Sequence, residues 1–174
     1  MRKTSYTKSG FTLIELIVVF SITTILSMVG IASFVTFSRQ EAVTTGTSEL
    51  KTMLTRAKSL TFSQVKPNQC TATQQFNGYK VLVCCSSGNL CPQPCQLGGD
   101  YELQVVCANN PVSIDTRTFA KQVTVDTTLS KTTSRSFWFQ PVTAAVVGAG
   151  KVTIKGIGYN KTATLTVSST GIIQ

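Results

Sequence analysis

Histidine is absent from the 174 residues of this chain. Without an imidazole there is no His-based general base, no Ser-His-Asp triad and no His-ligated metal site. Acidic residues are also few, seven against sixteen basic ones, and only 13% of residues are charged. The mean hydropathy of +0.17 argues against wholesale disorder. The length fits one globular domain with an appendage.

Charge is nearly lacking from Phe11 to Ser38, where Glu15 is the single charged residue. A helix needs about 20 apolar residues to cross a bilayer, so this run is long enough. It exceeds the apolar stretch of a cleaved signal peptide, which is about 7–15 residues long. The basic segment before it predicts a cytoplasmic N-terminus with the rest of the chain outside. A plain single-pass anchor remains an alternative on hydropathy alone.

Glu15 distinguishes these alternatives. A carboxylate at the centre of a membrane helix costs about 2.5–3.5 kcal/mol, so such residues tend to be functional. If the chain were cut after Gly10, Phe11 would carry a free α-amine. That amine on one subunit could pair with Glu15 on a neighbour. The competing interpretation is that Glu15 reaches the headgroups from a plain anchor.

The stretch from Lys8 to Ile17, KSGFTLIELI, resembles the processing motif of type IV pilins and of type II secretion pseudopilins. The resemblance implies cleavage between Gly10 and Phe11 by a prepilin peptidase, N-methylation of Phe11, and filament-core packing directed by Glu15. It implies other pilins, the peptidase and an inner-membrane assembly platform as partners. The implied location is the inner membrane, single-pass with the head outside, and then a periplasmic or cell-surface filament. Many major pilins have a proline in the apolar segment, whereas this chain has none before residue 67.

One long helix is expected from about residue 12 to 62, apolar all round at first and one-sided later. Val43, Leu50, Leu54, Ala57 and Leu60 form the apolar stripe of the second part. The predicted organisation is a leader at 1–10, a transmembrane or filament-core helix at 11–38, and its amphipathic continuation at 39–62. A β-rich head follows at 63–174, with a cysteine-stapled region at 70–107.

Strands are expected throughout the head, because Val, Ile, Thr and Phe alternate with polar residues between Gly, Asn, Pro and Ser clusters. The expected strands are Tyr79–Cys85, Tyr101–Cys107, Val112–Phe119, Gln122–Thr127, Arg135–Gln140, Val152–Ile157 and Thr162–Val167, with a short final strand at Ile172 and Ile173. A hairpin turn is expected at Gly158-Tyr159-Asn160. A helix packed on an antiparallel sheet or sandwich is an α+β fold.

The head also resembles GspH/FimT-type minor pilins, through the strand RSFWFQP at 135–141 and the terminal Gly171-Ile172-Ile173. This resemblance implies a β-sandwich against the helix. One departure is that Val142 and Thr143 follow Pro141, where that group has a glycine shortly after the proline.

The six cysteines all lie in one region of the head: Cys70, Cys84, Cys85, Cys91, Cys95 and Cys107. In an exported domain an even count predicts disulfides, with 15 possible connectivities left open. Structural zinc is the alternative, since Cys91 and Cys95 have acceptable ligand spacing. The chain has no Cys-x-x-Cys motif, which redox catalysts of the thioredoxin type use, so the sequence gives no sign of redox catalysis. We expect disulfides, no metal and no cofactor.

Residues 116–174 carry seven bases against Asp126 alone, which suggests nucleic acid as an alternative partner. The candidate DNA-contacting residues are Lys121, Lys131, Arg135, Lys151, Lys155 and Lys161. They are scattered along predicted strands, so a solvated lysine face is the simpler interpretation. Asp100 and Glu102 are the only close acidic pair, and nothing around them suggests a reaction, so the chain is expected not to be an enzyme. The leading hypothesis is a minor pilin or pseudopilin; the alternative is a DNA-binding minor pilin of an uptake pilus.

Overall fold

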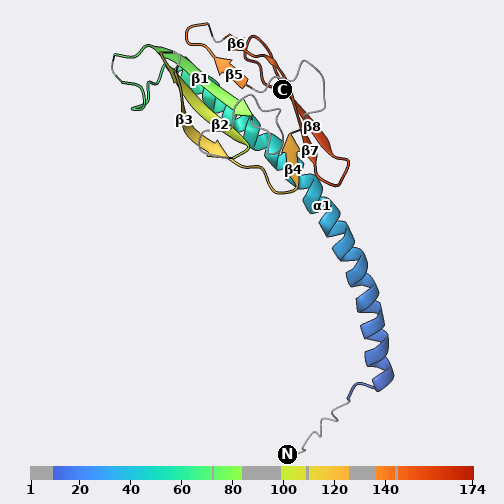
Figure 1. The fold of residues 1–174 in the computed structure, drawn as a ribbon. Coiled ribbons are helices and arrows are strands. Elements are labelled where there is room, and N and C mark those ends of the chain that lie inside the picture. Colours follow the sequence, from blue (N-terminus) through green and yellow to red (C-terminus); the bar gives the residue numbers. More distant parts are fainter. Residues whose placement is uncertain (1–9, 72, 84–98, 109, 126–135, 144) are drawn as a thin grey trace, which may run out of the picture. The chain divides into compact units, whose positions relative to one another are not determined.

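The computed structural model describes residues 10–71, 73–83, 99–108, 110–125, 136–143 and 145–174. The chain divides into two compact units, Met1–Ser38 and Arg39–Gln174. One helix, α1 (Leu13–Phe62), contributes to both units (Figure 1). We call Leu13–Ser38 the first half of α1 and Arg39–Phe62 its second half. The predicted helix over 12–62 is confirmed to within one residue.

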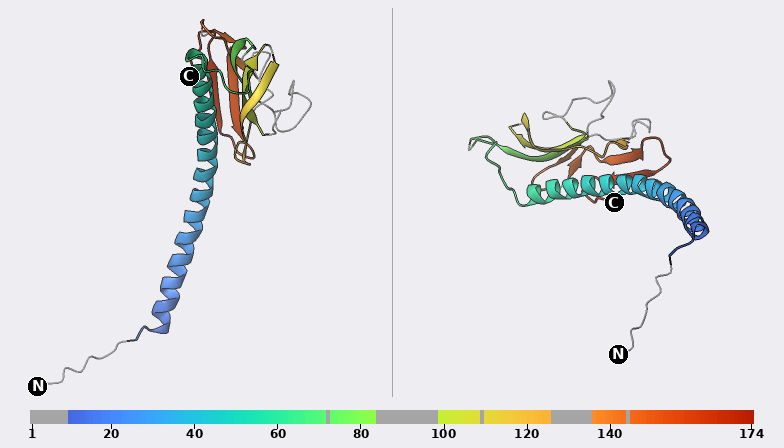
Figure 2. Two further views of the ribbon diagram at one scale, coloured as in Figure 1. Left: turned by 90° about the vertical axis from the view of Figure 1, so that its left-hand side faces the viewer. Right: turned by 90° about the horizontal axis from the view of Figure 1, so that it is seen from below.

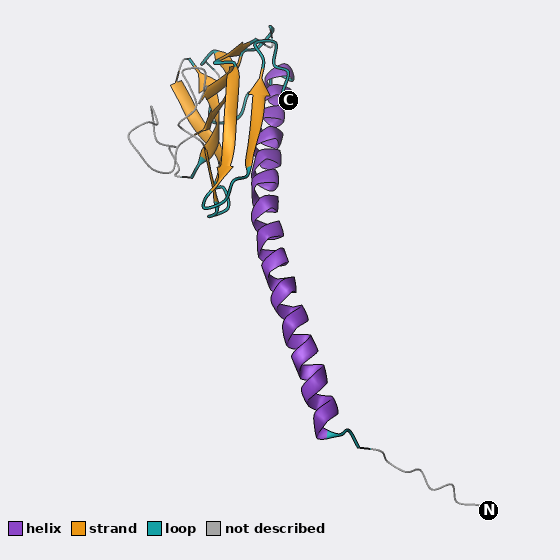
Figure 3. Ribbon diagram, turned by 90° about the vertical axis from the view of Figure 1, so that its right-hand side faces the viewer, coloured by secondary structure: helices purple, strands orange, loops and turns teal. Residues whose placement is uncertain are grey.

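The second half of α1 packs along the strands of the head (Figure 3). Val43, Leu50, Leu54 and Ala57 are fully buried, so the predicted apolar stripe is the face that the strands cover. Gly46 lies on the same face. A Cβ at this position would come within 3.2 Å of the Phe119 ring, so the absence of a side chain lets that ring lie against the helix.

Within the described residues, eight strands form two antiparallel sheets. The large sheet has the order β3-β2-β1-β5-β6, and the small sheet has the order β4-β7-β8. The strands of the large sheet are β1 (Phe76–Val83), β2 (Tyr101–Cys107), β3 (Asn110–Arg117), β5 (Ser136–Phe139) and β6 (Val146–Val147). Those of the small sheet are β4 (Val123–Val125), β7 (Gly150–Gly156) and β8 (Thr162–Val167). The predicted α+β class is therefore confirmed.

The predictions for β2 and β8 are confirmed residue for residue, and the β7–β8 hairpin turns at Gly158–Asn160 as expected. Strand β1 begins earlier than predicted, because a register shift at Gly78 interrupts its alternation. Strand β3 begins at Asn110, before Pro111. This proline is tolerated because β3 is an edge strand, where the missing N–H need not reach a second neighbour.

The ends of the sheet predictions differ in smaller ways. Strand β6 was not predicted, because two residues are too few for a periodic pattern. Of the predicted final strand, Ile173 forms an isolated bridge to Val167 on β8. The predicted ends at Cys84–Cys85, at 126–127 and at Arg135 lie outside the described residues.

Buried side chains of the second half of α1 and of both sheets form a single apolar core. A disulfide between Cys70 and Cys107 joins the segment that follows α1 to the end of β2, across 37 residues of sequence. Cross-links of this span typically stabilise a fold by about 2–4 kcal/mol. The other candidate cysteines, Cys84, Cys85, Cys91 and Cys95, lie outside the described residues.

Candidate assembly site

The start of α1 is capped by Thr12. The Thr12 Oγ1 atom accepts the backbone N–H of Glu15 at 3.4 Å, and the Thr12 carbonyl accepts the N–H of Leu16 at 3.2 Å. Thr12 and Glu15 have the S/T-x-x-E spacing of a capping box, in which a threonine at the N-cap and a glutamate three residues later support the first turn. Sequence reasoning missed this role of Thr12, although the spacing predicts it.

Glu15 also lies in the first turn of α1, next to the positive end of the helix dipole. Local helix chemistry therefore already favours a carboxylate at this position. A test of whether Glu15 serves assembly must separate its charge from its capping function.

The first half of α1 exposes its apolar side chains. Every large apolar side chain that the structure describes from Phe11 to Phe37 is exposed, with Phe11 at 77% and Phe34 at 70%. Among the described residues, α1 is the only helix long and apolar enough to cross a membrane. Exposed apolar surface costs roughly 25 cal/mol per Å², so this half requires an apolar environment from outside the chain.

Several hydroxyl groups on the first half of α1 donate hydrogen bonds to carbonyls of the same helix. Ser21 donates to the carbonyl of Val18 at 2.8 Å, and Thr24 donates to that of Phe20 at 2.7 Å. Ser27 donates to the carbonyl of Thr23 at 2.7 Å. In hydrocarbon an unpaired hydroxyl would be costly, so these bonds suit a helix surrounded by lipid or by other helices.

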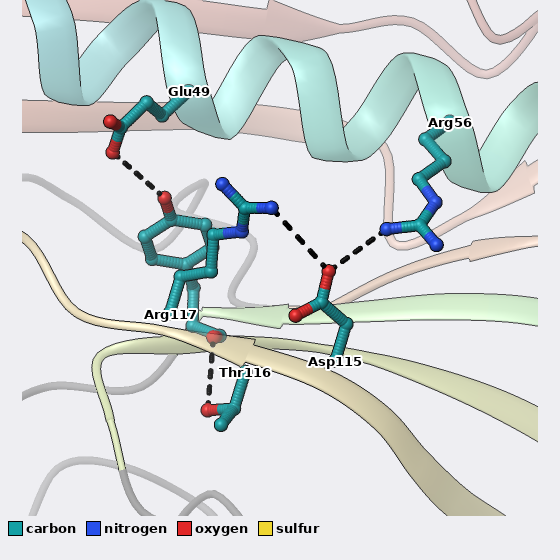
Figure 4. Close-up of polar contacts among 6 residues, drawn as sticks. Glu49, Arg56, Asp115, Thr116 and Arg117 are labelled. Carbon is teal, nitrogen blue, oxygen red and sulfur yellow. Dashed lines mark hydrogen bonds and ion pairs between the residues drawn. The ribbon is translucent and has the colours of Figure 1, made fainter.

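The head has a polar groove between the second half of α1 and the edge strand β3. Its volume is about 340 Å³, and its lining residues are Glu41, Thr44, Thr45, Ser48, Glu49, Thr52, Met53, Arg56, Asp115 and Arg117. The Asp115 carboxylate accepts from Arg56 at 2.9 Å and lies 3.8 Å from the Arg117 guanidinium (Figure 4). This ion-paired triad lies toward the C-terminal end of the helix, away from Glu41.

Glu49 contacts the wall of this groove. The Tyr101 hydroxyl on β2 donates to its carboxylate at 3.3 Å. Burial, and then the charge of Glu49 and this hydrogen bond, raise the pKa of Tyr101 to about 12. The neutral phenol is therefore the form that the folded head favours.

The small sheet brings candidate lysines together on its outer face. Lys151 and Lys155 are exposed on β7, two pleats apart, with their side chains on the face opposite the core residues Val152 and Ile154. Threonines of β8 lie beside them, with Thr166 opposite Lys151 and Thr162 opposite Lys155. Lys121 precedes β4 and Lys161 precedes β8, whereas Lys131 and Arg135 lie outside the described residues.

The acidic pair has structural partners. The Asp100 carboxylate accepts the N–H of Phe119 at 2.8 Å, and the Glu102 carboxylate accepts hydrogen bonds from Gln104 and Ser113. In the part of the chain that the structure describes, no group of three or more Cys, Asp or Glu residues could hold a metal ion. The zinc alternative depended on Cys91 and Cys95, which are outside that part.

Residues 6–31 match the family described as the prokaryotic N-terminal methylation motif. This motif supports a type IV pilin or pseudopilin, and the likeness is limited to these residues. The match spans Gly10, Phe11 and Glu15 and the start of the exposed apolar helix, and it does not reach the head. No curated protein and no solved structure gives a match to the chain.

The motif supports a pilin or pseudopilin subunit that a prepilin peptidase processes and that assembles with other pilins. The exposed apolar helix fits membrane anchoring followed by incorporation into a filament. Structural subunits of this kind are not typically enzymes.

Proposed function

We propose that this chain is a minor pilin or pseudopilin, cleaved between Gly10 and Phe11 and N-methylated on Phe11. Residues 1–10 are the leader, 11–38 the membrane and filament-core helix, 39–62 its amphipathic continuation and 63–174 the head. The head lies outside the inner membrane before the subunit joins a periplasmic or cell-surface filament. The observation that carries the proposal is the methylation motif at the start of α1, whose first half exposes every large apolar side chain that the structure describes there.

The conformation of Val142 supports the GspH/FimT subtype of the head. Val142 has a φ of 73°, and the N–H of Thr143 bonds to the carbonyl of Pro141 at 2.9 Å. A positive φ is uncommon for a β-branched residue and is readily adopted by glycine. The conformation that the subtype's glycine would adopt after the proline is therefore present here without the glycine.

The intact mass of the protein from its own cells, with and without reduction, tests the processing. We expect a chain that begins at a methylated Phe11 and gains six hydrogens on reduction if the six cysteines form three disulfides. A chain that still begins at Met1, in cells with an active prepilin peptidase, would mean an ordinary membrane anchor and would refute the proposal.

Glu15 is proposed to guide assembly by pairing with the Phe11 amine of a neighbour. Glu15→Val should still be cleaved but should enter filaments poorly. Glu15→Gln is the matched control, because glutamine retains the capping geometry and lacks the charge. If charge pairing guides assembly, both variants fail to incorporate; normal incorporation of Glu15→Gln would reduce the role of Glu15 to helix capping.

A DNA-binding minor pilin of an uptake pilus is the second candidate. The outer face of the small sheet favours it, since Lys151 and Lys155 are exposed there and no acidic residue occurs on β4, β7 or β8. Phosphate contacts make such binding strongly salt-dependent. Full-length processed protein in detergent that shows no salt-dependent affinity for duplex DNA would exclude this function.

A further inference from the structure

The exposed acidic side chains of the described head gather in one groove, which two arginines also line. The acidic side chains of the described head are Glu41, Glu49, Asp100, Glu102 and Asp115. Asp100 and Glu102 are buried, and the other three all line the groove between α1 and β3. The small sheet, in contrast, exposes Lys151 and Lys155 and has no acidic residue on its strands.

Within the groove, the ion pairs leave one end acidic. Asp115 is paired with Arg56 and Arg117, and these three residues together carry one net positive charge, so the negative charge of the groove lies at Glu41 and Glu49. Short hydroxyl side chains lie between these two glutamates, namely Thr44, Thr45 and Ser48. This surface is low enough for long side chains from another molecule to reach both carboxylates.

The two charged pairs have a similar spacing along the axes of their own elements. Glu41 and Glu49 are eight residues apart on a helix, which is about 12 Å along the axis. Lys151 and Lys155 are four residues apart on a strand, which is about 13 Å. Both lysines lie on the same outer face of β7, with Thr166 and Thr162 of β8 opposite them and Thr164 between these two threonines.

The two surfaces belong to different sides of the head. Both sheets cover one side of the second half of α1 (Figure 2), and in the view of Figure 1 strand β3 lies to the left of this helix and the β7–β8 hairpin to its right. They are therefore not placed to meet within one chain. A surface that fits another surface of the same chain makes a head-to-tail contact, which extends into a filament when the rotation does not close.

We propose that the lysine face of one subunit, Lys151 and Lys155, docks on the Glu41–Glu49 end of the groove of a second copy of this chain. The proposal rests on the assembly function above and adds which head surfaces meet. Exposed ion pairs contribute little affinity and mainly fix orientation and register, so the first half of α1 supplies most of the adhesion and this contact orients the heads.

Photo-crosslinking in intact cells tests the contact. A benzophenone amino acid in place of Ser48, in the full chain, should cross-link to a second copy, and the captured peptide should be the one that contains Thr164. Lys151→Glu with Lys155→Glu should lower this cross-link by about fivefold, the effect expected for two exposed pairs together. Lys66→Glu with Lys80→Glu is the control matched in net charge, at positions outside the groove and the small sheet, and it should leave the cross-link largely unchanged.

Charge reversal separates self-association from other roles of the lysines. Glu41→Lys with Glu49→Lys, combined with the two lysine-to-glutamate changes, should restore the cross-link. Because Glu49→Lys removes the hydrogen bond from Tyr101, the single change Glu41→Lys serves as a second variant, which should restore it in part. If the lysine-to-glutamate changes abolish the cross-link and the glutamate-to-lysine changes do not restore it, the lysines serve another partner, such as a polyanion. This result would overturn the proposed contact.

Failure of the head contact can be distinguished from failure of the proposed processing. A chain that is cleaved at Phe11 and enters filaments, but gives no cross-link between copies from position 48, overturns the head contact and leaves the assembly function intact. A chain that is not cleaved refutes the assembly function itself, whatever the cross-link shows.

Discussion

The two halves of α1 share one continuous helical backbone and differ in what covers their side chains. In the second half Leu50 and Leu54 are fully buried by the strands of the head, whereas in the first half Leu16 is 59% and Leu26 is 66% exposed. Leucine is common to both, so its burial is decided by context and not by residue type. The second half is stabilised by its own chain, and the first half by surroundings that the subunit must find in a membrane or a filament.

The largest expected effect comes from truncating one leucine in each half. Leu54→Ala should lower the free energy of unfolding of the head by about 2–5 kcal/mol, because it leaves a cavity among packed side chains. Leu26→Ala should change it by less than about 0.5 kcal/mol, since Leu26 is exposed and does not belong to the apolar core of the head. Denaturant unfolding of the full chain in detergent, followed by the fluorescence of Trp138, the only tryptophan, measures both. Equal effects would mean that the halves unfold as one unit.

The sequence predicts these halves well because each has a local pattern. An uninterrupted apolar run is visible without any tertiary knowledge, and so is the stripe containing Val43, Leu50 and Leu54. Strands β2 and β8 were found in the same way. The methylation motif is local too, which is why Gly10, Phe11 and Glu15 could be named from the sequence alone.

The polar groove could not be predicted from the sequence. Glu49 meets Tyr101 across 52 residues, and Arg56 meets Asp115 across 59, so each pair depends on how the sheet packs on the helix. Charge counting found an excess of lysine and described it as scattered. Only the strand register reveals that Lys151 and Lys155 share a face and that the exposed acids of the described head gather elsewhere.

Glycine positions in the two halves give a second, smaller test. A Cβ at Gly46 would come within 3.2 Å of the Phe119 ring, whereas one at Gly30 would meet nothing within 4 Å. Gly46→Leu should therefore overpack the core and lower the stability of the head by about 1–3 kcal/mol. Gly30→Leu should leave the head unchanged and favour the helix by up to about 1 kcal/mol. Unfolding midpoints and far-UV circular dichroism in detergent measure the two effects. Destabilisation of the head by Gly30→Leu would contradict the assignment of Gly30 to an uncovered surface.

Alkaline pH should give the smallest effect and should act on the head alone. The pKa of Tyr101 is raised to about 12 by burial and by Glu49, against 10.0 for a free tyrosine. Between those two values the unfolded chain loses the phenol proton while the folded head retains it, so the contribution of Tyr101 is complete below pH 10 and is lost as the pH approaches 12.

Tyr101→Phe should remove the pH-dependent contribution of this phenol to the free energy of unfolding. Whatever difference in stability separates the variant from the wild type at pH 8 should therefore shrink between pH 10 and pH 12. Comparing the two chains cancels the titration of the lysines, which both contain. Tyr79→Phe is the matched control, because burial raises the pKa of Tyr79 although Glu49 does not hydrogen-bond to it. The first half of α1 contains no tyrosine, so its helicity in detergent should stay constant while the head loses stability. A parallel loss of helix signal in Leu13–Ser38 would mean that the first half depends on the head for its helical structure. The apolar surroundings would then stabilise this half less than its exposed side chains imply.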